Sequence, residues 1–467
     1  MTEAPFPIPS PQERGNLASP EGDPAEDDRN GHSQAPTRGL PPRLLITASA
    51  WLSRIVGLGV QVYALRCLLS TLGSERYAVF ALLASLLPWY ALADIGIGYA
   101  VQNSVTERQA KNLPFREIVV SGLATGIVAL LGGVLLLVAL APVFAPQFLV
   151  QFPMLGRAEK IGLFLASGLL MSAATTTAIG AKCWYAVKMG HVANLLNIAG
   201  SAALMVGLVA AGVSPSLQTL TFYVCLFAGV PAVTGLISVA AFWRAYRLTI
   251  GDFRREAIHP IWERAKPFAL NTALVIAVLE VKYLIMSQLV GSRDIVFYNV
   301  VDRVFLGAYL LYVAALQALW PEVTELSAHN RQQEILRLIL RYITLGATFM
   351  LLTTLVFAIL KPAILTLLSP HEALGVPTSL ILWFGLQYTQ YAVVSAFGVA
   401  LQSMSKMKSF NIALCLQAAV SIPLQWYLTS ALGVRGLIVA TFVSTALTIG
   451  WVCPLLVIRQ TRLRVQS

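Results

Sequence analysis

The chain has 467 residues, of which 12% are charged and 57% are apolar, and it carries a formal net charge of +11. A soluble protein has roughly a quarter charged and about half apolar residues, so this composition excludes an ordinary water-soluble enzyme or binding domain. In a membrane protein the positive charges follow topology, and no nucleic-acid partner is expected from them.

Residues 1–42 differ in composition from the rest of the chain. They hold nine of the 24 prolines and the acidic run Glu26-Asp27-Asp28, with almost no apolar periodicity. Such a segment buries too little apolar surface to fold, so we expect a disordered cytoplasmic tail. It lacks the apolar stretch of a cleaved secretory signal, and the first membrane helix is expected to act as an uncleaved insertion signal.

Apolar runs of transmembrane length follow from residue 44 onward. A bilayer core about 30 Å thick needs about 20 apolar residues per helix, and runs that are apolar on all sides are unlike the alternating strands of a membrane barrel. We therefore predict an all-α polytopic membrane protein of about twelve transmembrane helices. The predicted helices span residues 44–70, 77–103, 117–141, 160–187, 191–213, 217–246, 266–290, 294–320, 337–360, 375–403, 408–430 and 434–458.

Lysine and arginine are distributed unequally between the two sets of loops. With twelve helices the termini share one side, and the segments on that side hold 23 of these residues against six on the other. Because positive charge collects in cytoplasmic loops, both termini are predicted to lie in the cytoplasm. Residues 247–265 then form a basic cytoplasmic linker, and residues 459–467 form a second cytoplasmic tail.

An internal repeat relates the two halves of the chain at a constant shift of 218 residues. Residues 103–112 read NSVTERQAKN and residues 321–330 read PEVTELSAHN, with five identical positions, and the same shift aligns Gly73 with Gly291. We predict two six-helix lobes, residues 43–246 and 266–458, related by an axis along the membrane normal. The substrate path should be a central cleft between the lobes.

The chain shows no motif for catalysis or for metal binding. It has no Gly-Lys pair and hence no Walker loop, and the longest predicted external loop, about residues 142–159, is too short for a glycosyltransferase or polymerase domain. The five cysteines form no CxxC pair and are interpreted as packing residues. We expect a transporter with no catalytic residue, cofactor or metal.

Seven ionisable residues lie inside predicted helices, where each costs about 2.5–3.5 kcal/mol on insertion scales and should face a cavity or a partner. All belong to the first two helices of a half, which are expected to face each other across the cleft. The expected central site combines the four deeper charges with two polar residues, of which Gln61 shares a helix face with Arg54 and Asn271 shares one with Lys282. Its residues are Arg54, Gln61, Asp94, Asn271, Glu280 and Lys282. Charges nearer the outer surface are interpreted as secondary cleft residues or structural ion pairs: Arg66, Asp302 and Arg303.

Helical geometry constrains which of these charges can share a cavity. Glu280 and Lys282 are separated by about 200° on a continuous helix, so the two should not point into one cavity, and one should pair with a neighbouring helix. A cavity with several cations suits an anionic ligand such as a pyrophosphate, to which arginine offers a planar fork of donors.

Two stretches of the first half resemble a known transporter family. Residues 72–80 read LGSERYAVF and residues 92–98 read LADIGIG, and their counterparts in the second half are LVGS at 289–292, Tyr298, and WPE at 320–322. This pattern resembles the Wzx-like polysaccharide flippases, which export O-antigen or exopolysaccharide. They belong to the superfamily of multidrug, oligosaccharidyl-lipid and polysaccharide exporters.

The resemblance implies a flippase that moves a polyprenyl-pyrophosphate-linked oligosaccharide across the cytoplasmic membrane by alternating access, for export or assembly of surface polysaccharide. It implies cations in the cleft of helices 1 and 7, which supports Arg54 and Lys282. The expected partners are the lipid-linked glycan, membrane lipids and other polysaccharide assembly proteins. Coupling to H⁺ or Na⁺ is left open, with Asp94 or Glu280 as the titrating group.

Two alternatives remain open at this stage. One is a multidrug or small-cation antiporter of the same fold, which calls for a net acidic or aromatic cleft. The excess of cations among the intramembrane charges disfavours it. The other is a membrane glycan polymerase or ligase, which the short external loops disfavour.

Overall fold

The computed structural model describes residues 42–94, 96–328, 331–368, 375–403 and 407–463. Every regular element in these ranges is a helix. The predicted disordered tail lies outside them except for its last residue, as do residues 464–467 of the second predicted tail.

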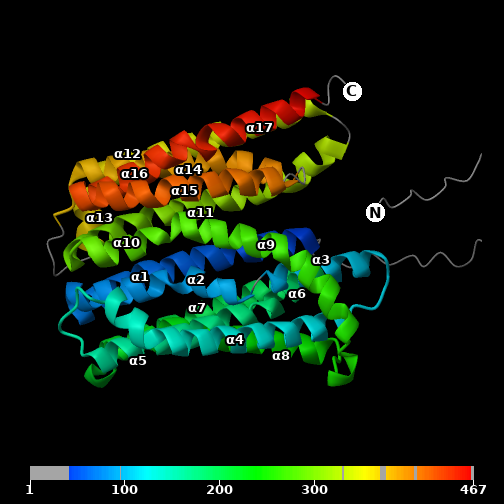
Figure 1. Ribbon diagram of the computed structural model, residues 1–467, viewed down its shortest axis with the longest axis horizontal. Helices are drawn as coiled ribbons and strands as arrows, with labels where there is room; N and C mark the ends of the chain where they lie inside the picture. The colour runs from blue at the N-terminus through cyan, green and yellow to red at the C-terminus, as the bar shows by residue number, and fades with distance from the viewer. Residues whose placement is uncertain (1–41, 95, 329–330, 369–374, 404–406, 464–467) are drawn as a thin grey trace, which may run out of the picture. The chain divides into compact units, whose positions relative to one another are not determined.

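The helices fall into two sets along the chain, which are coloured blue to green and green to red in Figure 1. The first set consists of α1 Pro42–Ser85, α2 Leu87–Tyr90, η2 Ala91–Asp94, α3 Ile97–Ala110, α4 Arg116–Phe148, α5 Arg157–Thr177, α6 Ile179–Ala186, α7 Gly190–Val213, η3 Pro215–Leu217 and α8 Leu220–Ala245. After the turns η4 Ile250–Asp252 and η5 Arg255–Ala257, the second set consists of α9 Ile258–Leu279, α10 Val281–Leu289, α11 Ser292–Ala328, α12 Gln332–Ile359, α13 Lys361–Leu368, α14 Thr378–Ser403, α15 Met407–Leu432, α16 Val434–Leu447 and α17 Ile449–Leu463.

Ten helices within the described ranges are long and apolar enough to cross a membrane. The chain is thus a multi-pass, all-helical membrane protein, while the count of twelve spans stays a prediction. Two differences account for the lower number. Helix α1 continues through a turn at Gly73, so the stretch Ala48–Tyr90, which covers two predicted helices, counts once. Helix α14, which carries Gln387 and Gln390, is not among the ten.

Several of the predicted helices are interrupted in the structure. The predicted helix 77–103 breaks between α1 and α3, where Gly96 has a left-handed backbone with φ 72°. The predicted helix 266–290 breaks between α9 and α10 at Glu280, whose φ is −110° and ψ −13°. Such breaks change the direction in which the following side chains point, and both lie beside the candidate site.

The helices of each set pack mainly on one another (Figure 1). In the first set, α1 packs against α7 and α8, and α5 packs against α4 and α8; in the second set, α14 packs against α11, α12 and α17, and α15 packs against α16. The two sets meet where α1 contacts α11 and where α3 contacts α9. The division into lobes at residues 43–246 and 266–458 stays a prediction that these contacts support.

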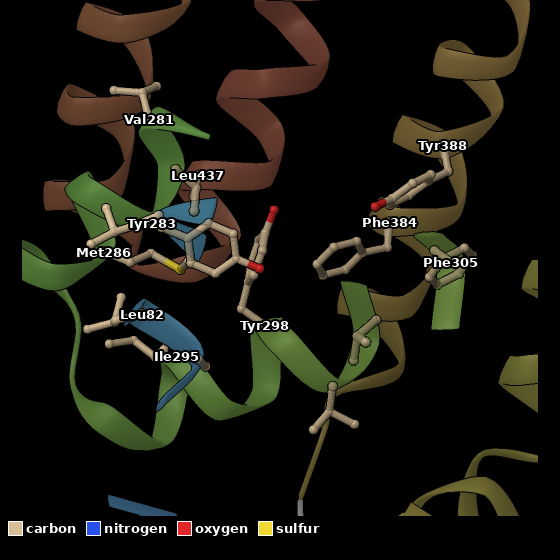
Figure 2. Packing of buried hydrophobic residues seen from close by; sticks show 14 of the residues in the cluster. Leu82, Val281, Tyr283, Met286, Ile295, Tyr298, Phe305, Phe384, Tyr388 and Leu437 are labelled. Carbon is tan, nitrogen blue, oxygen red and sulfur yellow. The ribbon is translucent and has the colours of Figure 1, made fainter. Parts of the chain in front are cut away.

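Buried rings fill the junction between α1, α10, α11 and α14, as Figure 2 shows. Tyr298 lies between Tyr283 and Phe384, with ring centroids 5.8 Å and 5.0 Å away, and Phe305 stacks on Tyr388 at 5.7 Å. Aromatic pairs at these separations add about 0.5–1.5 kcal/mol each beyond the area that they bury. The packing therefore fixes the helices that carry the polar residues described next.

Candidate functional site

A cavity of about 500 Å³ lies between α1 and α2 on one side and α9, α10, α11, α14, α15 and the start of α17 on the other. Much of its wall is apolar, from Ala81 and Ala84 of α1 to Leu306 of α11 and Phe410 of α15. The polar and charged side chains in the wall are Ser85, Glu280, Lys282, Tyr283, Asn299, Asp302, Arg303, Tyr309, Tyr388, Tyr391, Ser395 and Gln417. A mostly apolar cavity with a few convergent polar groups is the usual form of a ligand site.

The break at Glu280 brings Glu280 and Lys282 to the same cavity. The expectation that these two residues could not share a cavity is therefore wrong, because it assumed a continuous helix. The Glu280 amide still donates to the Ile276 carbonyl at 2.8 Å, whereas the Tyr283 amide donates to the Glu280 carbonyl at 3.2 Å, which is a tighter turn. Neither glycine nor proline stands at the break, so the sequence carries no signal for it.

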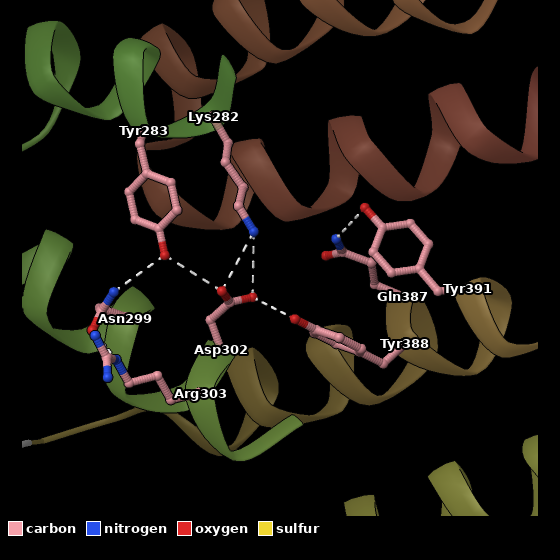
Figure 3. A network of polar contacts seen from close by, with 8 residues as sticks. All are labelled: Lys282, Tyr283, Asn299, Asp302, Arg303, Gln387, Tyr388 and Tyr391. Atoms are coloured by element: carbon pink, nitrogen blue, oxygen red, sulfur yellow. Dashed lines mark hydrogen bonds and ion pairs between the residues drawn. The ribbon is translucent and has the colours of Figure 1, made fainter. Parts of the chain in front are cut away.

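Asp302 of α11 is the most heavily bonded charge in the cavity (Figure 3). Lys282 Nζ lies 3.4 Å from each carboxylate oxygen, the Tyr388 hydroxyl donates to Oδ1 at 2.8 Å, and the Tyr283 hydroxyl donates to Oδ2 at 3.4 Å. The Lys282 ammonium also lies 5.2 Å from the centre of the Tyr298 ring. A nearly buried carboxylate held this way is already paired, and it holds Lys282 in place.

Arg303 and Glu280 are the two charged residues of the cavity wall whose side chains can still form hydrogen bonds that no described residue occupies. Arg303 donates from Nε to the Asn299 side-chain oxygen at 2.9 Å, and no other described residue bonds its guanidinium. No hydrogen bond or ion pair joins the Glu280 carboxylate to another described residue. One guanidinium edge and one carboxylate are thus open to a ligand.

The cavity has balanced formal charge. Two carboxylates, Glu280 and Asp302, stand against two cations, Lys282 and Arg303, among the described residues of the wall. The sequence led us to expect an excess of cations, and this expectation is wrong for the cavity. The reason is that Arg54 and Arg66 lie elsewhere.

None of the other five predicted site residues is part of the cavity wall. Asp94 forms an ion pair with Lys182 of α6 at 2.9 Å and accepts from the Gly98 amide at 3.0 Å, at the start of α3. Asn271 of α9 donates to Asn411 of α15 at 2.7 Å. The remaining three lie on α1, with Arg54 half-buried and Gln61 and Arg66 exposed.

Sequence reasoning missed the neutral members of the site. Asn299 precedes Asp302 and Arg303 by three and four residues, a spacing that places all three on one helix face, and this was the available signal. The tyrosines gave only a weak signal, because a ring in an apolar segment usually serves packing. Lys182, which lies in α6, neutralises Asp94 and was not among the predicted site residues.

The two helix sets contact each other both between α3 and α9 and between α1 and α11. Between α3 and α9, Arg264 of α9 donates to Glu107 of α3 at 2.7 Å, and the rings of Tyr99 and Phe268 stack at 5.6 Å. The hydrogen bond from Arg264 lowers the pKa of the exposed Glu107 carboxyl. Between α1 and α11, Tyr77 donates to Asn299, which itself lines the cavity.

Comparison with known proteins gives the family. No protein-family model matches the chain. A protein of Salmonella typhimurium named an O-antigen transporter is 30% identical over 419 residues, which cover 89% of this chain and 96% of that protein. A protein of Yersinia pseudotuberculosis named an O-antigen export protein is 28% identical over 420 residues, covering 89% of this chain and 95% of the relative.

Solved structures share the fold at low sequence identity. An inward-facing multidrug resistance MATE family transporter of the MOP superfamily superposes with a TM-score of 0.70 at 13% identity, over 89% of this chain and 99% of that one. The lipid II flippase MurJ in an inward closed conformation gives a TM-score of 0.66 at 13% identity, over 90% and 87% of the two chains. The predicted resemblance and the expectation of a membrane transporter are both confirmed: the chain belongs to the O-antigen transporter family.

Proposed function

We propose that this chain is a flippase that carries a polyprenyl-pyrophosphate-linked oligosaccharide across the bacterial inner membrane by alternating access. Support comes from the relatives named for O-antigen transport and from the fold shared with a lipid II flippase. The proposal includes cytoplasmic termini, which rest on the loop charges, and contact with other polysaccharide assembly proteins.

The cavity between α1 and α11 is the proposed site for the polar end of the lipid-linked glycan. The observation that carries this assignment is the Arg303 guanidinium, which lines the cavity with its terminal nitrogens unpaired among the described residues. A planar guanidinium binds phosphate oxygens in a two-pronged geometry. Tyrosine rings along the wall, such as Tyr309 and Tyr391, suit sugars, because a ring face is apolar and its hydroxyl can hydrogen-bond.

Glu280 is the proposed coupling carboxylate of the transport cycle. Its carboxylate lines the same cavity and has no bonded partner among the described residues, whereas Asp94 is neutralised by Lys182. A carboxylate without a partner can exchange a proton or a cation at low cost, because no ion pair must break first.

The test is Arg303→Ala in liposomes that contain a fluorescent undecaprenyl-pyrophosphate-linked oligosaccharide. We expect leaflet exchange of the probe to fall about tenfold or more, since a hydrogen bond to a charged group contributes about 1.5–3 kcal/mol. Arg303→Lys should fall less, because it keeps the charge and loses only the fork. Arg66→Ala is the matched control, since Arg66 is exposed and lies outside the cavity wall; equal exchange in all four proteins would refute the assignment.

A small-cation antiporter is the second candidate function. The balanced charge of the cavity and its four tyrosines, Tyr283, Tyr309, Tyr388 and Tyr391, would also suit an organic cation, and multidrug transporters share the fold. The same liposomes separate the two candidates. Glycolipid exchange without uptake of ethidium supports the flippase, and the reverse result supports the antiporter.

A further inference from the structure

We propose that Tyr77 and Asn299 are positioning residues that hold the Arg303 guanidinium in its ligand-binding orientation only while α1 is packed on α11. This inference rests on the proposed function of the cavity, because it concerns how Arg303 meets the anionic end of the substrate. The strength with which Arg303 binds the substrate therefore depends on whether α1 is packed on α11 beside the cavity.

Asn299 is the centre of the arrangement. Its side-chain oxygen accepts from both Arg303 Nε, at 2.9 Å, and the Tyr77 hydroxyl, and its side-chain nitrogen donates to the Tyr283 hydroxyl at 3.2 Å. Both acceptor positions of the oxygen are therefore used, and the amide is held at both ends. Figure 3 shows Asn299 with two of these partners, Tyr283 and Arg303. A side-chain amide fixed in this way fixes the plane of the guanidinium that bonds to it.

The Tyr77 hydroxyl is the only one of these contacts that comes from the first helix set. Tyr77 is fully buried in α1, four residues after the turn at Gly73, whereas Asn299, Tyr283 and Arg303 all lie on α10 and α11. If α1 separates from α11, the amide loses the hydroxyl, while its bonds within α10 and α11 remain.

Loss of the Tyr77 hydroxyl removes one of the three bonds that hold the amide, and so lowers the cost of turning the amide about its terminal bond. That rotation exchanges the oxygen with the nitrogen, and a nitrogen facing Arg303 Nε would set a donor against a donor. With the amide turned, the guanidinium loses its anchor and becomes mobile in the cavity. The cation consequently binds phosphate oxygens well when the helices are joined, and poorly when they part on this side, which is the behaviour needed to release an anionic substrate.

A double-mutant cycle tests the proposal on the full-length protein. Binding of the fluorescent undecaprenyl-pyrophosphate-linked oligosaccharide is measured in nanodiscs for wild type, Tyr77→Phe, Arg303→Ala and the double variant. We expect Tyr77→Phe to weaken binding about fivefold in the wild-type background, as loss of one hydrogen bond does, and by less than about twofold in the Arg303→Ala background. A purely structural role would give the same loss in both backgrounds.

Tyr223→Phe is the matched control. Tyr223 is also a fully buried tyrosine, and its hydroxyl accepts from Thr71 of α1 at 3.0 Å, within the first helix set. It should leave probe binding unchanged, and thermal unfolding should show that both phenylalanine variants fold. Asn299→Ala, which removes the shared acceptor, should weaken binding at least as much as Tyr77→Phe and should likewise lose its effect without Arg303.

The outcomes separate this inference from the proposed function. If Arg303→Ala binds the probe as wild type does, the site assignment itself fails. If Arg303→Ala loses binding while Tyr77→Phe keeps it, only the positioning role fails. Equal losses for Tyr77→Phe in both backgrounds also overturn the positioning role.

Discussion

Asp302→Asn is expected to lower the free energy of unfolding by about 3 kcal/mol, because removing one partner of a buried ion pair leaves the other charge uncompensated. Asp302 is 4% exposed and accepts from Lys282, Tyr283 and Tyr388. The asparagine keeps the shape of the side chain but cannot neutralise the ammonium. The midpoint of thermal unfolding in detergent measures the loss.

The control for this prediction removes the second charge as well. Asp302→Asn combined with Lys282→Met eliminates the buried pair, and replacing a whole buried pair is often close to neutral. The double variant should therefore recover much of the stability that the single variant loses. A double variant as unstable as the sum of Asp302→Asn and Lys282→Met alone would contradict the ion-pair interpretation.

Gly96→Ala is expected to destabilise the protein by about 2–5 kcal/mol. Gly96 has a left-handed backbone, which costs an L-residue about 1–2 kcal/mol, and crowding adds about 1–3 kcal/mol. A methyl group at this position would lie 2.6 Å from the Ala265 carbonyl oxygen and 2.9 Å from the Ala269 amide nitrogen. Since both are backbone atoms of α9, α3 and α9 must move apart to accept it.

Gly59→Ala provides the comparison, because a methyl group added there meets nothing within 4 Å. In a helix interior such a change usually stabilises slightly, since alanine has the higher helix propensity. Unfolding midpoints of the two variants should therefore shift in opposite directions. Equal midpoints would mean that α3 and α9 are not in close contact in the membrane.

The arrangement of long helices could be predicted from the sequence because the bilayer imposes one length and one polarity on every span. The charges of the second half were also informative. Glu280, Lys282, Asp302 and Arg303, chosen because charge inside a membrane is costly, all line one cavity. The intramembrane charges of the first half lie outside this cavity. Asp94 pairs with Lys182, and Arg54 and Arg66 lie elsewhere on α1.

What could not be predicted depends on contacts between distant segments. The break at Glu280 follows no glycine or proline, so helical periodicity alone places Glu280 and Lys282 on opposite faces. Tyr77 and Asn299 are 222 residues apart, and nothing in either segment indicates that they meet. The central role of Asn299 follows only from the structure, which brings Tyr77 of α1 and Arg303 of α11 to the same side-chain oxygen.

Two of the contacts between the helix sets differ in how they respond to ionic strength. The contact of Arg264 with Glu107 is an exposed charge pair 2.7 Å apart, which added salt weakens as the screening length falls from about 10 Å at 0.1 M to about 3 Å at 1 M. The contact of Tyr77 with Asn299 is a buried bond between neutral groups, which salt leaves nearly unchanged. Added salt should therefore loosen the α3–α9 side selectively, and a concentrated buffer is a simple means to bias the protein toward opening there.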